Sequence, residues 1–195
     1  MEVNRRILIV DDNESVHNDF RKILCPAKKD ENDVMFDELE TALFYEGVER
    51  KPTISIDYEL DFASQGREGF GKVLAADEAG EPFSLIITDV RMPPGIDGIL
   101  LIKEVWKVLP QTQVVIASAF SDYTWEDIVG VLGLSDHLMI LRKPWDAITI
   151  KQLALALTKK WTVEAQLKKY RNHLRGIVSN MKNNPESDGH EMPKF

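Results

Sequence analysis

The chain of 195 residues contains a single cysteine, Cys25. One cysteine cannot form an internal disulfide, and its presence is compatible with a reducing compartment. No apolar run approaches the roughly 18 residues of a membrane-spanning helix, and the N-terminus lacks the pattern of a secretory signal peptide. These absences predict a soluble cytoplasmic protein with no membrane span.

Positive charge is also scarce. The formal net charge is −8 and the pI is about 5.1, which argues against a general binder of nucleic acid or membranes. The sequence has only four histidines, and they show no spacing typical of metal ligands: His17, His137, His173 and His190. Hydrophobic residues make up 44% of the chain, enough for the core of one domain with extensions.

Four apolar runs, each closed by polar residues, dominate what the sequence does contain. They are residues 7–10 before Asp11-Asp12, 85–87 before Thr88-Asp89, 114–117 before Ser118, and 138–141 before Arg142-Lys143-Pro144. Continuous Ile, Val and Leu runs separated by helical stretches are typical of strands buried on both faces of a parallel sheet.

The remaining periodicity predicts an alternation of strands and helices. Strands are expected at 5–12, 58–63, 83–89, 114–118 and 138–143, and helices at 13–24, 67–78, 99–109, 123–132 and from 146 onward. Residues 58–63 alternate apolar and polar side chains, as a less buried strand near a sheet edge does. Five such units predict an α/β fold with right-handed crossovers.

The domain organisation follows from breaks in this alternation. Residues 1–160 are expected to form one domain, interrupted at about 27–57 by a long charged connection with a short amphipathic helix around residues 35–43. A helical extension is expected at 161–182. The polar segment 183–195 is expected to be disordered.

The extension carries an apolar seam with heptad spacing. Its members are Val163, Leu167, Tyr170, Leu174, Ile177 and Met181. This spacing favours a parallel coiled coil and hence a homodimer, rather than a helix whose apolar residues pack back on their own domain. The extension is basic, which is more often a solvated face than a nucleic-acid or lipid site.

Functional groups gather beyond the carboxyl ends of strands in open parallel sheets. Here those ends carry Asp11, Asp12, Asp89, Ser118 and Lys143. Clustered carboxylates repel one another unless a cation or proton neutralises them, and an all-oxygen set of few ligands suits Mg²⁺ beside phosphate. Each group alone has an ordinary explanation as a cap, a turn or a strand exit. Together they indicate a site that holds a phosphoryl group while a carboxylate attacks it.

The motifs at these strand ends resemble one known family. They are Asp11-Asp12, Asp89-Val90-Arg91-Met92-Pro93 with Asp97-Gly98, Ser118-Ala119-Phe120, and Lys143-Pro144. As a set they resemble the receiver domain of two-component response regulators over roughly residues 5–160. The resemblance implies a flavodoxin-like, doubly wound parallel sheet of five strands in the order 2-1-3-4-5.

The resemblance also implies a role for each residue of the site. Asp89 would accept phosphate from a histidine kinase or a phosphotransfer protein. Asp12, Asp89 and the backbone carbonyl of Arg91 would bind Mg²⁺, with Asp11 acting through water. Ser118 and Lys143 would contact the phosphoryl group, and the Lys143–Pro144 bond would be cis. The protein would then catalyse only its own phosphorylation and dephosphorylation.

Some positions depart from the family pattern. Ser118 stands where Thr is commoner, Ile140 stands where an aromatic residue is usual, and the loop after Met92 is one residue longer. Phe120 is expected to shield the phosphoryl group from water. One alternative is the N-terminal part of a larger regulator with a kinase or cyclic-di-GMP output domain. Another is a Mg²⁺-dependent phosphohydrolase, but such enzymes often carry a second Asp at the position of Arg91.

Overall fold

The computed structural model describes residues 2–26, 56–93, 95, 97–119 and 123–183. The amphipathic helix expected around residues 35–43, Phe120, and residues 184–195 of the expected tail lie outside the described residues.

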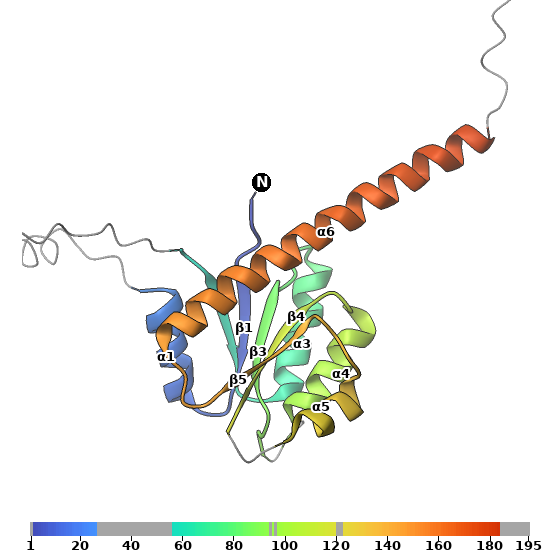
Figure 1. Ribbon diagram of the computed structural model, residues 1–195. Coiled ribbons are helices and arrows are strands. Elements are labelled where there is room, and N and C mark those ends of the chain that lie inside the picture. Colours follow the sequence, from blue (N-terminus) through green and yellow to red (C-terminus); the bar gives the residue numbers. More distant parts are fainter. Residues whose placement is uncertain (1, 27–55, 94, 96, 120–122, 184–195) are drawn as a thin grey trace, which may run out of the picture.

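A five-stranded parallel sheet forms the centre of the domain (Figure 1). Its strands are β1 (Arg6–Val10), β2 (Glu59–Ala63), β3 (Leu85–Asp89), β4 (Gln113–Ser118) and β5 (Leu138–Arg142). They pair in the order β2-β1-β3-β4-β5. This confirms the flavodoxin-like order, and it confirms that the alternating strand β2 lies at an edge.

Each strand of the described chain is followed by a helix. The helices are α1 (Glu14–Leu24), α3 (Gly66–Glu78), α4 (Gly98–Val108), α5 (Trp125–Leu132) and α6 (Ala147–Asn183). Side chains at the N-caps explain several starts, since Asn13 accepts a hydrogen bond from the N–H of Ser15 and Asp97 from that of Leu100. The helix expected from residue 123 begins at Trp125, because Thr124 and Asp127 form a capping box.

The two faces of the sheet bury separate apolar cores. On one face, β-strand residues such as Leu8 and Ile116 pack with residues of α3, α4 and α5. On the other face, their neighbours Ile9 and Val115 pack with α1 and with the first half of α6 (Figure 1). The continuous apolar runs of the sequence follow from this arrangement, because alternate side chains of a strand enter opposite cores.

The strand register aligns the carboxyl ends of the sheet. Val10 pairs with Thr88, Asp89 with Ala117, and Ser118 with Arg142. The residues just beyond these pairs therefore emerge at one edge, as the sequence predicted.

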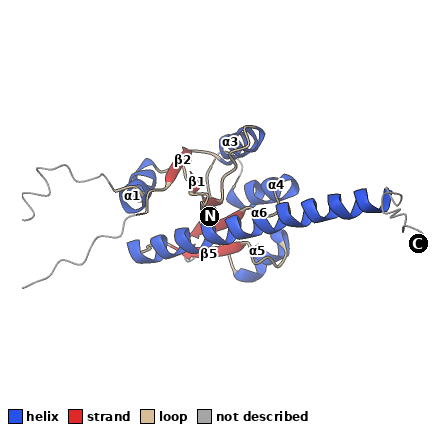
Figure 2. Ribbon diagram, turned by 90° about the horizontal axis from the view of Figure 1, so that it is seen from above, coloured by secondary structure: helices blue, strands red, loops and turns tan. Residues whose placement is uncertain are grey.

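Helix α6 has 37 residues and two different halves. Ile150, Ala154 and Leu157 are at most 4% exposed against the sheet. From Leu167 the described side chains are exposed, and the helix continues past the rest of the domain in both views (Figures 1 and 2). The predicted boundary at residues 160 and 161 falls inside this helix and stays a prediction. No helix of the described residues is long and apolar enough to cross a membrane.

The doubly covered sheet makes a stability prediction. Ile116 is fully buried in β4, whereas Ile148 on α6 is 70% exposed. Ile116→Ala should lower the free energy of unfolding by about 2–5 kcal/mol, because it removes buried surface and leaves a cavity. Ile148→Ala, the matched control, should change it by less than about 0.5 kcal/mol. Denaturant unfolding of both variants measures the difference, and equal losses would contradict the assigned core.

Candidate functional site

The ammonium group of Lys143 joins the ends of two strands. Its Nζ lies 3.0 Å from Oδ2 of Asp11, which follows β1, and 2.9 Å from Oδ1 of Asp89, which ends β3. Lys143 itself directly follows β5. Three segments distant in sequence therefore place charged groups in one cluster, here called the pocket, at the carboxyl edge of the sheet.

Burial and hydrogen bonds with the backbone position Asp11 at this site. The residue is only 2% exposed, and its Oδ1 accepts a hydrogen bond of 2.9 Å from the backbone N–H of Asn13. Its own N–H donates to the carbonyl of Ala63 on the edge strand. The other carboxylate oxygen is thereby left to face Lys143.

Asp89 is positioned by close packing of the start of α4. The N–H of Gly98 donates to the carbonyl of Val90 at 3.0 Å, and a Cβ at Gly98 would lie 2.0 Å from the backbone oxygen of Asp89. Only glycine permits this approach. The hydroxyl of buried Thr88 also donates to that backbone oxygen, at 3.0 Å. The geometry explains why Gly98 stands at this position.

Burial raises the pKa of Asp89. Desolvation is the largest cause, the hydrogen bond and charge of Lys143 act against it, and the negative charge of Asp11 adds to the rise. Desolvation therefore disfavours the ionised form of Asp89, while the neighbouring Lys143 favours it.

The same pocket raises the pKa of Lys143. Burial alone would lower it, but the hydrogen bonds to Asp89 and Asp11, together with their charges, outweigh burial. Lys143 is therefore held as the ammonium ion. The backbone N–H of Lys143 donates to the carbonyl of Ser118 at 2.9 Å. The peptide bond between Lys143 and Pro144 is cis, as predicted.

The other predicted residues border this pocket in different ways. Ser118 ends β4, is 5% exposed, and its hydroxyl donates to the carbonyl of Ala119 at 2.9 Å. Asp12 and Arg91 are exposed at the same edge of the sheet. Trp145 packs on Phe20 with ring centroids 5.3 Å apart, and Nζ of Lys143 lies 5.5 Å from the Trp145 centroid.

The carboxylates of Asp11, Asp12 and Asp89 do not form a compact triad. Among the described residues, one group of three metal-ligating side chains lies within 4.8 Å, and it is elsewhere: Asp136, His137 and Glu164. Sequence spacing did not reveal that group, because Glu164 is 27 residues from His137 and meets it only through the packing of α6.

The raised pKa of Asp89 predicts how a substitution affects stability. A carboxyl group with a raised pKa in the folded state binds its proton more tightly there than in the unfolded chain. Its ionised form therefore destabilises the fold above the folded-state pKa, and the effect vanishes below the ordinary pKa of about 3.9. Asp89→Asn should raise the Tm by about 1–4 °C near neutral pH.

Calorimetry across acid and neutral pH measures this shift. The advantage of Asp89→Asn should disappear near pH 3, which lies below the unfolded-state pKa of about 3.9. Asp12→Asn, at an exposed position, is the control and should change the Tm little at either pH. A lower Tm for Asp89→Asn at neutral pH would contradict the described pocket.

Comparisons with known proteins agree with this fold. No model of a known protein family matches the chain. A curated relative, the uncharacterized transcriptional regulatory protein YesN of Bacillus subtilis, is 28% identical over 129 residues, which cover 62% of this chain and 35% of YesN. The chain therefore spans about a third of the length of that relative.

Several solved structures share the fold. The signal receiver domain of an HD domain-containing protein from Pseudomonas fluorescens has a TM-score of 0.58 at 17% identity, covering 85% of this chain and 95% of its own. A CheY-like response regulator receiver domain from Methanospirillum hungatei has a TM-score of 0.54 at 20% identity, with coverages of 82% and 98%. A two-component transcriptional regulator from Clostridium phytofermentans has a TM-score of 0.54 at 24% identity, covering 83% and 95%. The chain has the fold of response regulator receiver domains, as its motifs predicted.

Proposed function

We propose that this chain is a Mg²⁺-dependent phosphoacceptor domain of two-component signalling, phosphorylated on Asp89 by a histidine kinase or phosphotransfer protein. The observation that carries the proposal is the pairing of Lys143 with both Asp11 and Asp89. A buried and a partly buried carboxylate beside one ammonium group suit phosphoryl transfer to a carboxylate.

The donor set fits Mg²⁺. Oxygen atoms of carboxylates are the ligands that this ion prefers, and two carboxylates, those of Asp11 and Asp89, lie beside one ammonium group. Asp11, Asp12, Asp89 and the backbone carbonyl of Arg91 would hold the ion. When bound, Mg²⁺ supplies positive charge to the oxygens of the transferred phosphoryl group.

The residues of the chain account for the remaining chemistry. An Oδ of Asp89 attacks phosphorus in line, the phosphorus–nitrogen bond of a phosphohistidine breaks, and the electron pair of that bond leaves with the imidazole. The ammonium of Lys143 shifts from the Asp89 carboxylate to a phosphoryl oxygen. The Ser118 hydroxyl, now bonded to the carbonyl of Ala119, turns to donate to another. The product is an acyl phosphate on this chain, so no external substrate is consumed.

Other readings of the pocket have less support. A phosphohydrolase would be expected to carry a second carboxylate two residues after Asp89, and Arg91 stands there. The length of the curated relative bears on a possible output domain. The transcriptional regulatory protein YesN is almost three times as long as the part of YesN that matches this chain. We infer that the phosphorylation state is read by a further domain or by a partner.

A small phosphodonor tests the proposed acceptor. Acetyl phosphate with Mg²⁺ should add one phosphoryl group to the chain, and peptide mapping should place it on Asp89. Asp89→Asn should gain none. Lys143→Met should be phosphorylated slower by about 10²-fold or more, because a developing negative charge loses its partner.

The control for this experiment is Asp97→Asn, which alters the cap of α4 but leaves the pocket residues in place. It should gain phosphate at close to the native rate. Trp145 emission offers a second readout, since the Lys143 ammonium would move relative to the indole ring. Phosphate on another residue, or equal labelling without Mg²⁺, would refute the proposal.

We also propose that the free half of α6 pairs with a second copy of the chain. The seam residues are exposed to different degrees in the single chain: Val163 38%, Leu167 62%, Tyr170 68%, Leu174 60%, Ile177 43% and Met181 71%. They therefore do not pack back on their own domain. Exposed apolar side chains at heptad spacing are buried when two such helices associate.

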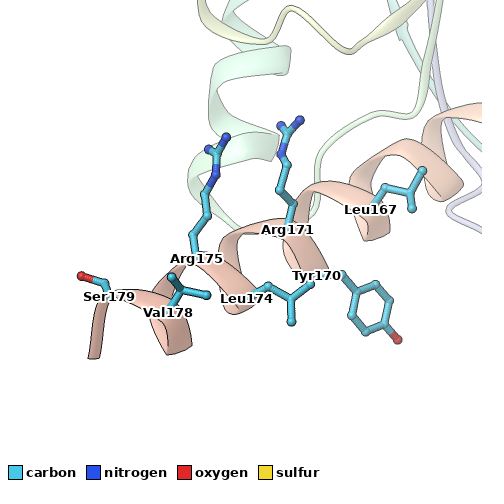
Figure 3. Close-up of a pocket in the computed structure, with 7 residues that line it drawn as sticks. All are labelled: Leu167, Tyr170, Arg171, Leu174, Arg175, Val178 and Ser179. Atoms are coloured by element: carbon cyan, nitrogen blue, oxygen red, sulfur yellow. The ribbon is translucent and has the colours of Figure 1, made fainter. Parts of the chain in front are cut away.

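The arrangement of charge supports the same pairing. Tyr170 and Leu174 extend to one side of the helix, while Arg171 and Arg175 extend to another (Figure 3). Leu167 and Val178 line the same shallow groove as these residues. Charged groups that flank an apolar seam remain in water when the seam is buried.

Sedimentation at increasing concentration tests the pairing with matched variants. Leu174→Asp and Asn172→Asp each add one negative charge, but position 172 lies outside the seam. The native chain and Asn172→Asp should form dimers. Leu174→Asp should weaken association by about tenfold or more, because a charge replaces a buried apolar contact. A monomeric native chain, or equal weakening by both substitutions, would contradict the pairing.

A further inference from the structure

Gln65 stands at the N-cap of α3 but does not use its side chain there. Its backbone carbonyl accepts a hydrogen bond of 2.9 Å from the N–H of Gly69, whereas its side chain makes no capping hydrogen bond within the described chain. At the N-caps of α1, α4 and α5, by contrast, the side chains of Asn13, Asp97 and Thr124 each bond to their own helix. The Gln65 amide therefore does not secure the start of α3.

The side chain of Gln65 lies instead against the described part of the loop between β3 and α4. Its Nε2 lies 3.5 Å from the carbonyl oxygen of Pro93, at the long limit of a hydrogen bond. A Cβ at Gly95 would lie 2.1 Å from Oε1 of Gln65 and 3.2 Å from its Cδ. Because glycine has no Cβ, it lets the amide approach the backbone this closely. The amide therefore packs directly on the loop.

The amide oxygen of Gln65 is buried at this contact. Among the described residues it has no hydrogen-bond partner. A buried acceptor without a donor is unfavourable, and native structures contain few of them. Packing on Gly95, rather than a strong hydrogen bond, therefore holds the side chain in place.

The loop that Gln65 touches is also anchored by the core. Met92 is 1% exposed, and its carbonyl accepts a hydrogen bond of 3.1 Å from the N–H of Gly95. Farther along, the N–H of Gly98 donates to the carbonyl of Val90 at 3.0 Å. The loop is therefore held at Met92 by the core and at Gly95 by the Gln65 amide.

We propose that Gln65 is a positioning residue for Mg²⁺ at the site of Asp89. The backbone carbonyl of Arg91, a proposed ligand of the ion, directly precedes Met92 in the same loop. Mg²⁺ demands near-ideal octahedral geometry, so its ligands must stand at fixed places. Gln65 holds the loop and thereby keeps the Arg91 carbonyl in place, without touching the ion itself. This inference rests on the proposed phosphoacceptor function.

A purely structural role of Gln65 is the competing explanation. In that case loss of the side chain would lower the Tm and leave the affinity of the folded chain for Mg²⁺ unchanged. Mg²⁺ affinity, measured well below the Tm of every variant, therefore separates the two roles.

Two substitutions remove the contact from opposite sides. Gln65→Ala deletes the amide, and Gly95→Ala adds a methyl group that displaces it. The backbone tolerates alanine at position 95, since positive φ angles among the described residues occur at Gly80 and Gly133 instead. Gly71→Ala is the matched control, because a Cβ at Gly71 would meet nothing within 4 Å.

An NMR titration of the backbone amides with MgCl₂ measures binding without a phosphodonor. Gln65→Ala and Gly95→Ala should each raise the Kd for Mg²⁺ by about three- to tenfold, less than the loss of a group that directly orients a ligand. The double variant should lose no more than either single variant, because both changes remove the same contact. Gly71→Ala should bind as the native chain does.

Phosphorylation kinetics distinguish positioning from a general loss of activity. With acetyl phosphate, Gln65→Ala should need about three- to tenfold more Mg²⁺ for its half-maximal rate. Its rate at saturating Mg²⁺ should stay within about twofold of the native rate.

Hydrogen exchange tests the contact itself without Mg²⁺ or a phosphodonor. The Gly95 amide, which donates to Met92, should exchange faster in Gln65→Ala than in Gly71→Ala. Equal exchange in the two variants would show that Gln65 does not hold the loop, and would overturn the inference.

The Mg²⁺ measurements separate failure of this inference from failure of the proposed function. Equal Mg²⁺ affinity of the native chain and Gln65→Ala would overturn the positioning role and leave the phosphoacceptor function standing. Additive losses in the double variant would do the same, since they would show two unrelated effects. A native chain that neither binds Mg²⁺ nor gains phosphate would contradict the proposed function, and the positioning role with it.

Discussion

The attraction between the Lys143 ammonium and the carboxylates of Asp11 and Asp89 is the interaction on which the site depends. It joins the ends of β1, β3 and β5, which are neighbours only because the sheet is parallel and its strands end in register. Burial raises the pKa of Asp89 although the contact with Lys143 acts in the opposite direction. The proposed Mg²⁺ and phosphoryl group would both be held at this cluster of charges.

The fold positions the site by packing rather than by the site's own contacts. Both faces of the sheet are covered, so the strands are fixed along their length and their ends vary little. The close approach of Gly98 to the Asp89 backbone fixes the start of α4 against the end of β3. The hydroxyl of Ser118 donates to the backbone carbonyl of Ala119.

The sequence predicted the sheet and its edge well, for a physical reason. Buried parallel strands need uninterrupted apolar runs, and the polar residues that end them must emerge at one side. It predicted the pocket of Asp11, Asp89 and Lys143 on the same grounds. It did not predict that Lys143 would contact both carboxylates directly, since that depends on side-chain reach. The contacts of His137 were also missed, because they join residues from different elements through the packing of α6.

The two halves of helix α6 lie in different surroundings. Its first half completes the core, and its second half presents an apolar seam to solvent. Ion pairs of Asp136 and His137 with Lys160 and Glu164 lie near the boundary between these halves. The pocket at Lys143 lies at the other end of β5. One strand therefore runs between the two clusters.

The most direct measurement of the central claim is an NMR titration of the Asp89 carboxyl carbon, with and without Mg²⁺. The account predicts that the pKa of Asp89 lies above its ordinary value without the ion and falls when Mg²⁺ is added, because the ion neutralises the buried pair. In Lys143→Met the pKa should rise further. An ordinary pKa that neither Mg²⁺ nor the loss of Lys143 changes would contradict the account, since the three strand ends would then not form one electrostatic site.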